Sequence, residues 1–141
     1  MSRENVELAR RAYATFGEAD LDTFIERYLH PDVEWDDPPE FPSAQTHHGH
    51  EGAERHLRDL LAEFDKARAD TLEVIDCGDD RVLVFVREAG RGKRSGIELD
   101  MTVAHLVTFR GGKAARVQVF VDRVQALRAA GLSEQDARAD A

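Results

Sequence analysis

The sequence has a single cysteine, four prolines and no long hydrophobic run. One cysteine, Cys77, excludes an internal disulfide and a cysteine-rich metal site. No apolar stretch approaches the roughly 20 residues of a membrane-spanning helix, and the first residues lack the apolar segment of a signal peptide. Basic residues are also few: 19 Lys and Arg stand against 28 Asp and Glu, a net charge of −9. This balance argues against nucleic acid and against an anionic membrane as partners, because both attract basic faces. The sequence therefore predicts a soluble, cytoplasmic protein.

The composition is nevertheless that of a folded protein. Hydrophobic residues make up 42% of the 141 residues, enough for a core. Neither a repeat nor a linker divides the chain, so we expect one domain over residues 1–132 and a charged tail over residues 133–141.

The first half of the chain has mainly helical periodicity. Apolar residues recur every three or four positions before Gly17, again between Asp20 and Pro31, and over residues 51–67. Alternation over residues 33–37 predicts a short strand, and residues 40–49 read as a loop.

The second half changes to strand patterns. Residues 71–77, 81–88, 97–109 and 114–121 predict four antiparallel strands, and Gly111-Gly112 marks the last hairpin. A short helix follows over residues 122–130, where Asp122 is placed to be its N-cap. The fold class is therefore α+β.

The predicted sheet is apolar on both faces. Val82, Val84 and Val86 share one face of their strand, and Leu83 and Phe85 share the other. A sheet of this kind is covered on both sides. We expect the N-terminal helices to cover one face and a second copy of the chain to cover the other, which predicts a homodimer.

Four groups of residues, in this order, resemble the nuclear transport factor 2-like superfamily, and most of all its SnoaL-like branch. They are AYATF at 12–16 with ADL at 19–21, HPDVEW at 30–35 with DP at 37–38, GHEG at 49–52, and TFRGGK at 108–113 with VFVDR at 119–123. The resemblance implies a cone in which a curved antiparallel sheet wraps around the N-terminal helices and encloses a central pocket. The superfamily includes ketosteroid isomerase-like, epoxide hydrolase-like, polyketide cyclase-like and non-catalytic proteins, so the fold alone does not specify the chemistry.

Asp37 is the first candidate catalytic residue. It stands in an Asp-Pro pair where ketosteroid isomerase-like proteins carry their proton-shuttling aspartate, and a carboxylate at an apolar pocket can act as a general base. The alternative is a turn aspartate held by backbone N–H groups.

His105 is the second candidate, because it interrupts an apolar strand between Val103 and Val107. The isomerase-like enzymes place an acidic hydrogen-bond donor at about this point, and a histidine can donate to a substrate oxygen. The alternative is a buried structural histidine. The resemblance also places the first-helix tyrosine of the isomerases near Ala12, one position from Tyr13 and on another face, so the oxyanion site is incomplete or rebuilt around His105.

The resemblance and strand parity predict which further side chains bind the substrate. These are Phe16, Phe24, Tyr28, Trp35, Leu60, Arg87, Met101, Val103, Val119 and Val121. Val119 stands where the epoxide hydrolase-like branch has an inward aspartate, which argues against that activity. Three histidines, His47, His48 and His50, suggest metal but lack an acidic ligand at a fixed spacing. We therefore expect neither a metal nor a cofactor.

Three functions remain open. The first is acid–base chemistry (isomerisation, cyclisation or hydration) on a small hydrophobic substrate. The second is non-catalytic binding of a small hydrophobic ligand, and the third is a dimeric accessory role of the sheet surface.

Overall fold

The computed structural model describes residues 2–18 and 20–139 of the chain, and it has the expected α+β class. The helices are α1 (Ser2–Gly17), α2 (Leu21–Tyr28), α3 (Gly49–Ala62), α4 (Arg123–Ala129) and α5 (Glu134–Ala139). The strands are β1 (Leu29–Asp36), β2 (Thr46–His48), β3 (Phe64–Gly78), β4 (Arg81–Gly92), β5 (Glu98–Arg110) and β6 (Lys113–Phe120). None of the described helices combines the length and apolarity that crossing a membrane requires.

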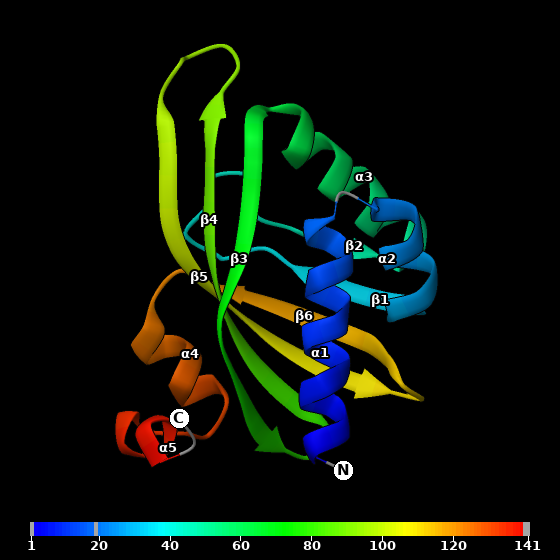
Figure 1. Ribbon diagram of the computed structural model, residues 1–141, viewed down its shortest axis with the longest axis vertical. Coiled ribbons are helices and arrows are strands. Elements are labelled where there is room, and N and C mark those ends of the chain that lie inside the picture. The colour runs from blue at the N-terminus through cyan, green and yellow to red at the C-terminus, as the bar shows by residue number, and fades with distance from the viewer. Residues whose placement is uncertain (1, 19, 140–141) are drawn as a thin grey trace.

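All six strands form one bent sheet in the order β2-β1-β6-β5-β4-β3 (Figure 1). Strands β3 to β6 make the predicted antiparallel meander. Strand β1 pairs in parallel with β6, so that Trp35 lies beside Val117. The β5–β6 hairpin turns at Gly111 and Gly112, whose φ angles of 61° and 77° are accessible to glycine at little cost.

Helices α1, α2 and α3 cover one face of the sheet and form the main core with it (Figure 1). Alternate residues of each strand point into this core, as strand geometry requires. Val33 and Trp35 on β1, Val103 and Val107 on β5, and Val117 on β6 belong to this core.

The opposite face of the sheet is covered by α4, which corrects the sequence-based argument for a dimer. Leu83 and Phe85 of β4 are buried with Leu106 of β5 against Ala126 and Leu127 of α4. The expectation that helices cover only one face was wrong, because the short C-terminal helix folds back onto the sheet. The apolar strands therefore give no reason for a second copy of the chain, and the homodimer stays a prediction.

Helix α4 is held at its start by the predicted cap. The Asp122 carboxylate accepts a hydrogen bond of 3.0 Å from the backbone N–H of Val124. We expect Asp122→Ala to lower the free energy of unfolding by about 1 kcal/mol, because one N–H of the first turn loses its partner. Urea denaturation would measure the change. Asp122→Asn keeps the acceptor and should be near neutral; an equal loss in both variants would contradict the capping role.

Several boundaries differ from the sequence-based expectation. Residues 63–67 were expected to extend the third helix, but α3 ends at Ala62 and β3 begins at Phe64, where it pairs with Gly92 of β4. The expected loop over residues 40–49 contains β2, which pairs with β1. Within the tail, α5 is tied to α4 by a 2.9 Å ion pair between Arg123 and Glu134, whereas residues 140–141 lie outside the described part of the chain.

Candidate functional site

A narrow cavity of about 90 Å³ lies between the helices α1 to α3 and the sheet. Its walls are mostly apolar or aromatic, and a few polar side chains converge on it. The lining residues are Tyr13, Phe16, Phe24, Trp35, Asp37, Pro38, Phe41, His56, Leu57, Leu60, Ala69, Val86, Glu88, Val103, His105 and Val119. Apolar walls with a few convergent polar groups are typical of small-molecule sites.

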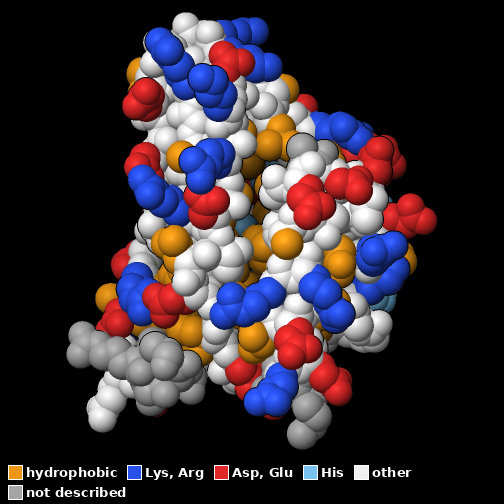
Figure 2. All heavy atoms as spheres, in the orientation of Figure 1, with side chains coloured by type: hydrophobic (Ala, Val, Ile, Leu, Met, Phe, Trp, Pro, Cys, Tyr) orange, Lys and Arg blue, Asp and Glu red, His pale blue; other side chains and the backbone are white. Residues whose placement is uncertain are grey.

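Two further spaces adjoin this cavity and share Leu60 and Glu88 with it. One is an apolar hollow of about 230 Å³ that Phe16, Leu61 and Phe64 help to line. Figure 2 shows a hollow with hydrophobic side chains inside it in the upper half of the molecule, on the face turned to the viewer. The other is an open cleft of about 820 Å³ on the side of β2 and α3. A ligand larger than the cavity could therefore extend into either space.

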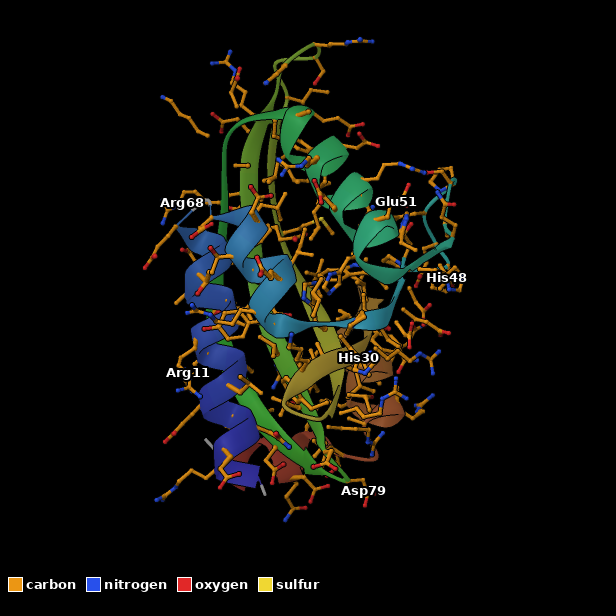
Figure 3. The ribbon with its side chains drawn as sticks, turned by 90° about the vertical axis from the view of Figure 1, so that its right-hand side faces the viewer. Arg11, His30, His48, Glu51, Arg68 and Asp79 are labelled. Carbon is orange, nitrogen blue, oxygen red and sulfur yellow. The ribbon has the colours of Figure 1, made fainter. Side chains whose placement is uncertain are left out.

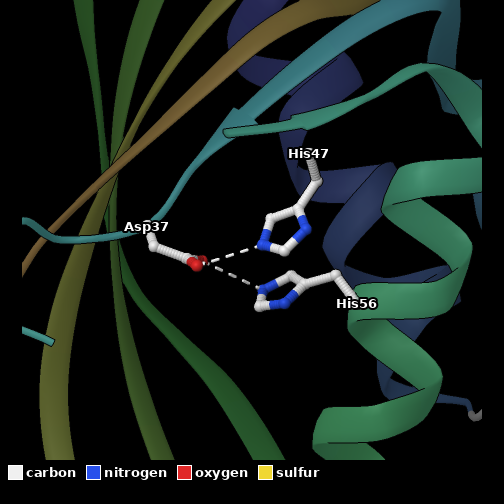
Figure 4. Close-up of side chains that lie close together, drawn as sticks. All are labelled: Asp37, His47 and His56. Carbon is white, nitrogen blue, oxygen red and sulfur yellow. Dashed lines mark hydrogen bonds and ion pairs between the residues drawn. The ribbon is translucent and has the colours of Figure 1, made fainter. Parts of the chain in front are cut away.

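Asp37 lies at the junction of cavity and cleft and binds two histidines (Figure 4). Its Oδ2 is 3.0 Å from Nε2 of His47, and its Oδ1 is 3.4 Å from Nε2 of His56. The two imidazole rings stack at 4.0 Å between centroids, with an interplanar angle of 19°. The side chains are 11%, 12% and 21% exposed for Asp37, His47 and His56. The sequence places these three residues 10 and 9 positions apart, and the fold makes them one cluster.

The local structure explains why they meet. Asp37 directly follows β1. The next residue, Pro38, is buried and cannot continue the strand. His47 faces Trp35 in the antiparallel β1–β2 pair, which brings β2 back past Asp37. His56 comes from α3, which packs on β1. The backbone N–H of Gln45 also donates to Oδ2 of Asp37 at 3.4 Å, so the same carboxylate accepts from the turn and lines the cavity.

Burial and charge keep His56 neutral. Burial lowers the pKa of His56, and the neighbouring His47 lowers it further, against the opposing effect of Asp37 and Asp59. Two stacked imidazoles repel each other when both are charged. Protonation of His56 is therefore disfavoured within the cluster.

A second polar pair, Tyr13 and His105, stands on the sheet side of the cavity. The Tyr13 hydroxyl lies 2.5 Å from Nδ1 of His105, which is 6% exposed. Burial, with a smaller effect of His56, lowers the pKa of His105 to about 4, so the ring is neutral at pH 7. Burial and the Glu88 charge raise the pKa of Tyr13, so the phenol stays protonated. Whichever group donates in this hydrogen bond, the pair keeps one further N–H or O–H to donate.

Trp35 connects the two polar groups. Its ring lies 6.2 Å from that of His56 and makes an edge contact at 5.7 Å with that of His105. The indole therefore contacts a member of each group and gives the cavity an apolar surface beside both. An apolar surface of this kind excludes water, and the hydrogen bonds of both groups are stronger where water is excluded.

Glu88 is a polar residue of the site that the sequence did not single out. It follows Val82, Val84 and Val86 on the inward face of β4 and lines the cavity, the hollow and the cleft. Burial raises the pKa of Glu88. Extending the alternation of the valines by one more step would have found it.

The structure brings most of the predicted substrate-binding residues to one cavity and leaves four elsewhere. Phe16, Phe24, Trp35, Leu60, Val103 and Val119 line it together with Asp37 and His105. Tyr28 borders a separate small void, Met101 lines the cleft, and Val121 packs at the edge of the core. Arg87 lies outside and corrects the prediction: odd positions of β4 face outward, and its half-exposed side chain pairs with Asp100 at 2.6 Å.

The structure also places Tyr13 and the histidines of the loop. Tyr13 was placed on another face from the site, yet its hydroxyl reaches His105 because α1 lies directly over the sheet. Of the histidines in the loop, only His47 among the described residues joins the cluster. His50 instead bonds the carbonyl oxygen of Leu29 at 2.7 Å, and His48 is exposed and lies at the outer edge of the molecule (Figure 3).

Comparison with known proteins connects this architecture to a family. The SnoaL-like domain model matches residues 9–117. The uncharacterized protein Rv0034 of Mycobacterium tuberculosis is 32% identical over 117 residues, which cover 82% of this chain and 87% of that protein.

Solved structures share the fold of this chain. Bal32a, from a soil-derived mobile gene cassette, superposes with a TM-score of 0.77 at 25% identity and covers 89% of this chain and 94% of its own. TerC, co-crystallised with polyporic acid, superposes with a TM-score of 0.71 at 28% identity and covers 91% of this chain and 98% of its own.

Proposed function

The chain belongs to the SnoaL-like domain family, and from this premise we propose that it binds a small hydrophobic molecule in the cavity and transfers a proton on it. The family resemblance in the sequence is thereby confirmed, while the reaction itself rests on the site. The proposed reaction is an isomerisation, cyclisation or hydration of a carbonyl compound, and side chains of the cavity transfer the proton.

The observation that carries the proposal is the placement of two complementary proton-handling groups around one apolar cavity. Asp37, with His47 and His56, can accept a proton and share it among three side chains. The neutral His105–Tyr13 pair can donate a hydrogen bond to an oxygen that gains negative charge when that proton leaves. A base and a hydrogen-bond donor on one substrate are the requirements for enolisation of a carbonyl compound.

Each residue then has a role. Asp37 is the general base, and the histidines that flank it hold its carboxylate in place and delocalise the proton that it takes. His105 is the hydrogen-bond donor, positioned by Tyr13. The aromatic walls of Phe16, Phe24 and Trp35 favour an apolar or aromatic substrate. The co-crystallisation of TerC with polyporic acid supports a small organic ligand for this chain.

A second function is favoured by one observation. Both oxygens of Asp37 already have partners, since His47, His56 and the Gln45 N–H surround them. A carboxylate that is fully engaged can be structural, in which case the cavity holds a hydrophobic ligand without transforming it. Binding and proton transfer must therefore be measured separately.

The protein's single tryptophan provides the binding assay. Trp35 lines the cavity, so an aromatic ketone or a quinone that enters is expected to quench its fluorescence. Proton transfer on the bound compound is then followed by NMR in D2O, as deuterium uptake at the carbon next to the carbonyl. This readout requires no knowledge of the natural substrate.

Substitutions separate the two functions. We expect Asp37→Asn to slow deuterium uptake by about 100-fold or more, and His105→Gln by about 10- to 100-fold, with binding changed only a few-fold. Asp36→Asn is the matched control, because Asp36 pairs with Arg116 and Thr46 instead. Quenching without uptake, or uptake that neither variant slows, would reject the catalytic proposal, and quenching alone would support the binding protein.

A further inference from the structure

We propose that Asp37, His47 and His56 form a binding site for one divalent transition-metal ion, for which Zn²⁺ and Co²⁺ are suitable probes. This inference goes beyond the proposed function, in which Asp37 acts without a metal. One carboxylate and two imidazoles make a ligand set that suits zinc and the neighbouring first-row ions.

The geometry of the three side chains supports the site. Their ligand atoms all lie within 4.8 Å of one another. Bonds of about 2.0–2.2 Å to a tetrahedral zinc ion place neighbouring ligand atoms roughly 3.3–3.5 Å apart. The carboxylate oxygens of Asp37 already lie 3.0 and 3.4 Å from the Nε2 atoms of the two histidines, which is close to that spacing. An ion would take the place of the hydrogen bonds that now join the carboxylate to the rings, and the stacked imidazoles would splay to direct both Nε2 atoms at it.

The cluster is also built on rigid elements. Asp37 is fixed by the end of β1 and the buried Pro38, His47 by its pairing with Trp35 in the β1–β2 ladder, and His56 by α3. Ligands from three elements that are held by backbone hydrogen bonds need little reorganisation to bind.

The surroundings favour a cation as well. The open cleft that leads to the cluster is lined, among the described residues, by Arg55 and by five carboxylates: Asp37, Glu51, Asp59, Glu63 and Glu88. Arg55 is itself paired with Glu51 at 3.2 Å. A cleft with this excess of negative charge concentrates cations. The cleft would leave the remaining coordination positions of the ion open to water, the arrangement of catalytic rather than structural zinc sites.

Metal binding and the proposed base function exclude each other at Asp37. A bound ion would occupy the carboxylate oxygens that accept the proton in the proposed reaction. The metal-loaded protein is therefore expected to lose the deuterium uptake described above, whereas the chelator-treated protein keeps it.

The test uses the full chain after removal of metal with a chelator. Zn²⁺ binding is measured by calorimetry, and the visible spectrum of the Co²⁺ complex reports the nitrogen and oxygen ligands and the coordination number. We expect one ion per chain, with His47→Ala and His56→Ala each weakening Zn²⁺ binding by about tenfold or more. His48→Ala is the matched control, since His48 is adjacent in sequence but exposed and outside the cluster. Its effect should be within about twofold.

Circular dichroism of each variant separates loss of a ligand from loss of fold. Folded variants that still bind Zn²⁺ as tightly as the parent chain would overturn the proposal, as would chelator-treated parent protein that binds no stoichiometric ion. Because these measurements need no organic substrate, a failure of the metal site leaves the proton-transfer assay intact. A failure of that assay equally leaves the metal titration intact.

Discussion

Replacing Phe85 with alanine is expected to lower the free energy of unfolding by about 3–5 kcal/mol. Phe85 is 2% exposed and lies in the core under α4, so its removal leaves a void that the rigid sheet cannot close. The guanidinium of Arg123 sits 4.3 Å from the centre of its ring, and this contact is lost as well. Urea denaturation followed by circular dichroism would measure the loss.

The Phe85 experiment also tests whether Phe85 is buried within one chain. If it is, the loss of stability caused by the substitution is independent of protein concentration. If Phe85 lay in an interface between copies, that loss would change with concentration. Leu72→Ala is the control, because Leu72 is 52% exposed and its truncation should change the stability by about 0.5 kcal/mol or less.

Acidification is expected to destabilise the protein by about 3 kcal/mol between pH 6.5 and pH 4 through His105 alone. Burial lowers the pKa of His105 from 6.5 to about 4 in the folded chain. Between these pH values His105 binds a proton in the unfolded chain but not in the folded chain. The stability that His105 contributes is thus fully present above pH 6.5 and is lost as the pH falls toward 4.

Other groups around His105 shift this profile with different signs. His56 also has a lowered pKa, so its contribution falls in acid as well, whereas the raised pKa of Glu88 gives stability that is lost as the pH rises. Tyr13 stays protonated throughout this range. The His105 contribution is therefore isolated as the difference between the parent chain and His105→Gln.

The measurement is a set of urea denaturation curves of both proteins between pH 4 and pH 7. We expect the stability difference between them to shrink by about 3 kcal/mol toward pH 4. The ring protons of His105, followed by NMR, should not titrate above about pH 5. Parallel pH profiles of the two proteins, or a His105 that titrates near its ordinary value, would contradict the burial argument.

Local patterns sufficed for much of the fold. The valines of β4, the Gly111-Gly112 turn and the Asp122 cap act through neighbours in sequence, so their structures follow from short-range rules. The start of β3 does not: residues 63–67 contain glutamate, lysine and alanine, which suit a helix, but Phe64 and Asp65 pair with Gly92 and Arg91 of β4. Sheet pairing is decided by a distant strand, and it overrides local propensity.

The sequence singled out individual residues that line the cavity, but not their arrangement. His105 was selected because it interrupts an apolar strand, and Asp37 because the family resemblance places a proton-shuttling aspartate at its Asp-Pro pair. The partners of these residues come from other elements: His56 from α3 and Tyr13 from α1. Which face of a helix meets which residue of a sheet depends on how the helix is rotated and where it crosses, and this information is spread over the whole core. The covering of Phe85 by α4 was missed for the same reason.

The parallel pairing of β1 with β6 has a consequence for the order in which the molecule assembles. Trp35 and Val117 are joined across roughly 80 residues of chain, and closing so long a loop is entropically costly. The meander of β3 to β6 needs only short closures, so we expect it to form early, with β1 and β2 docking onto it late. Asp37, His47 and Trp35 would then reach His105 in the final step of folding. A denaturation intermediate that has lost only this last step would keep a folded meander and would have no cavity.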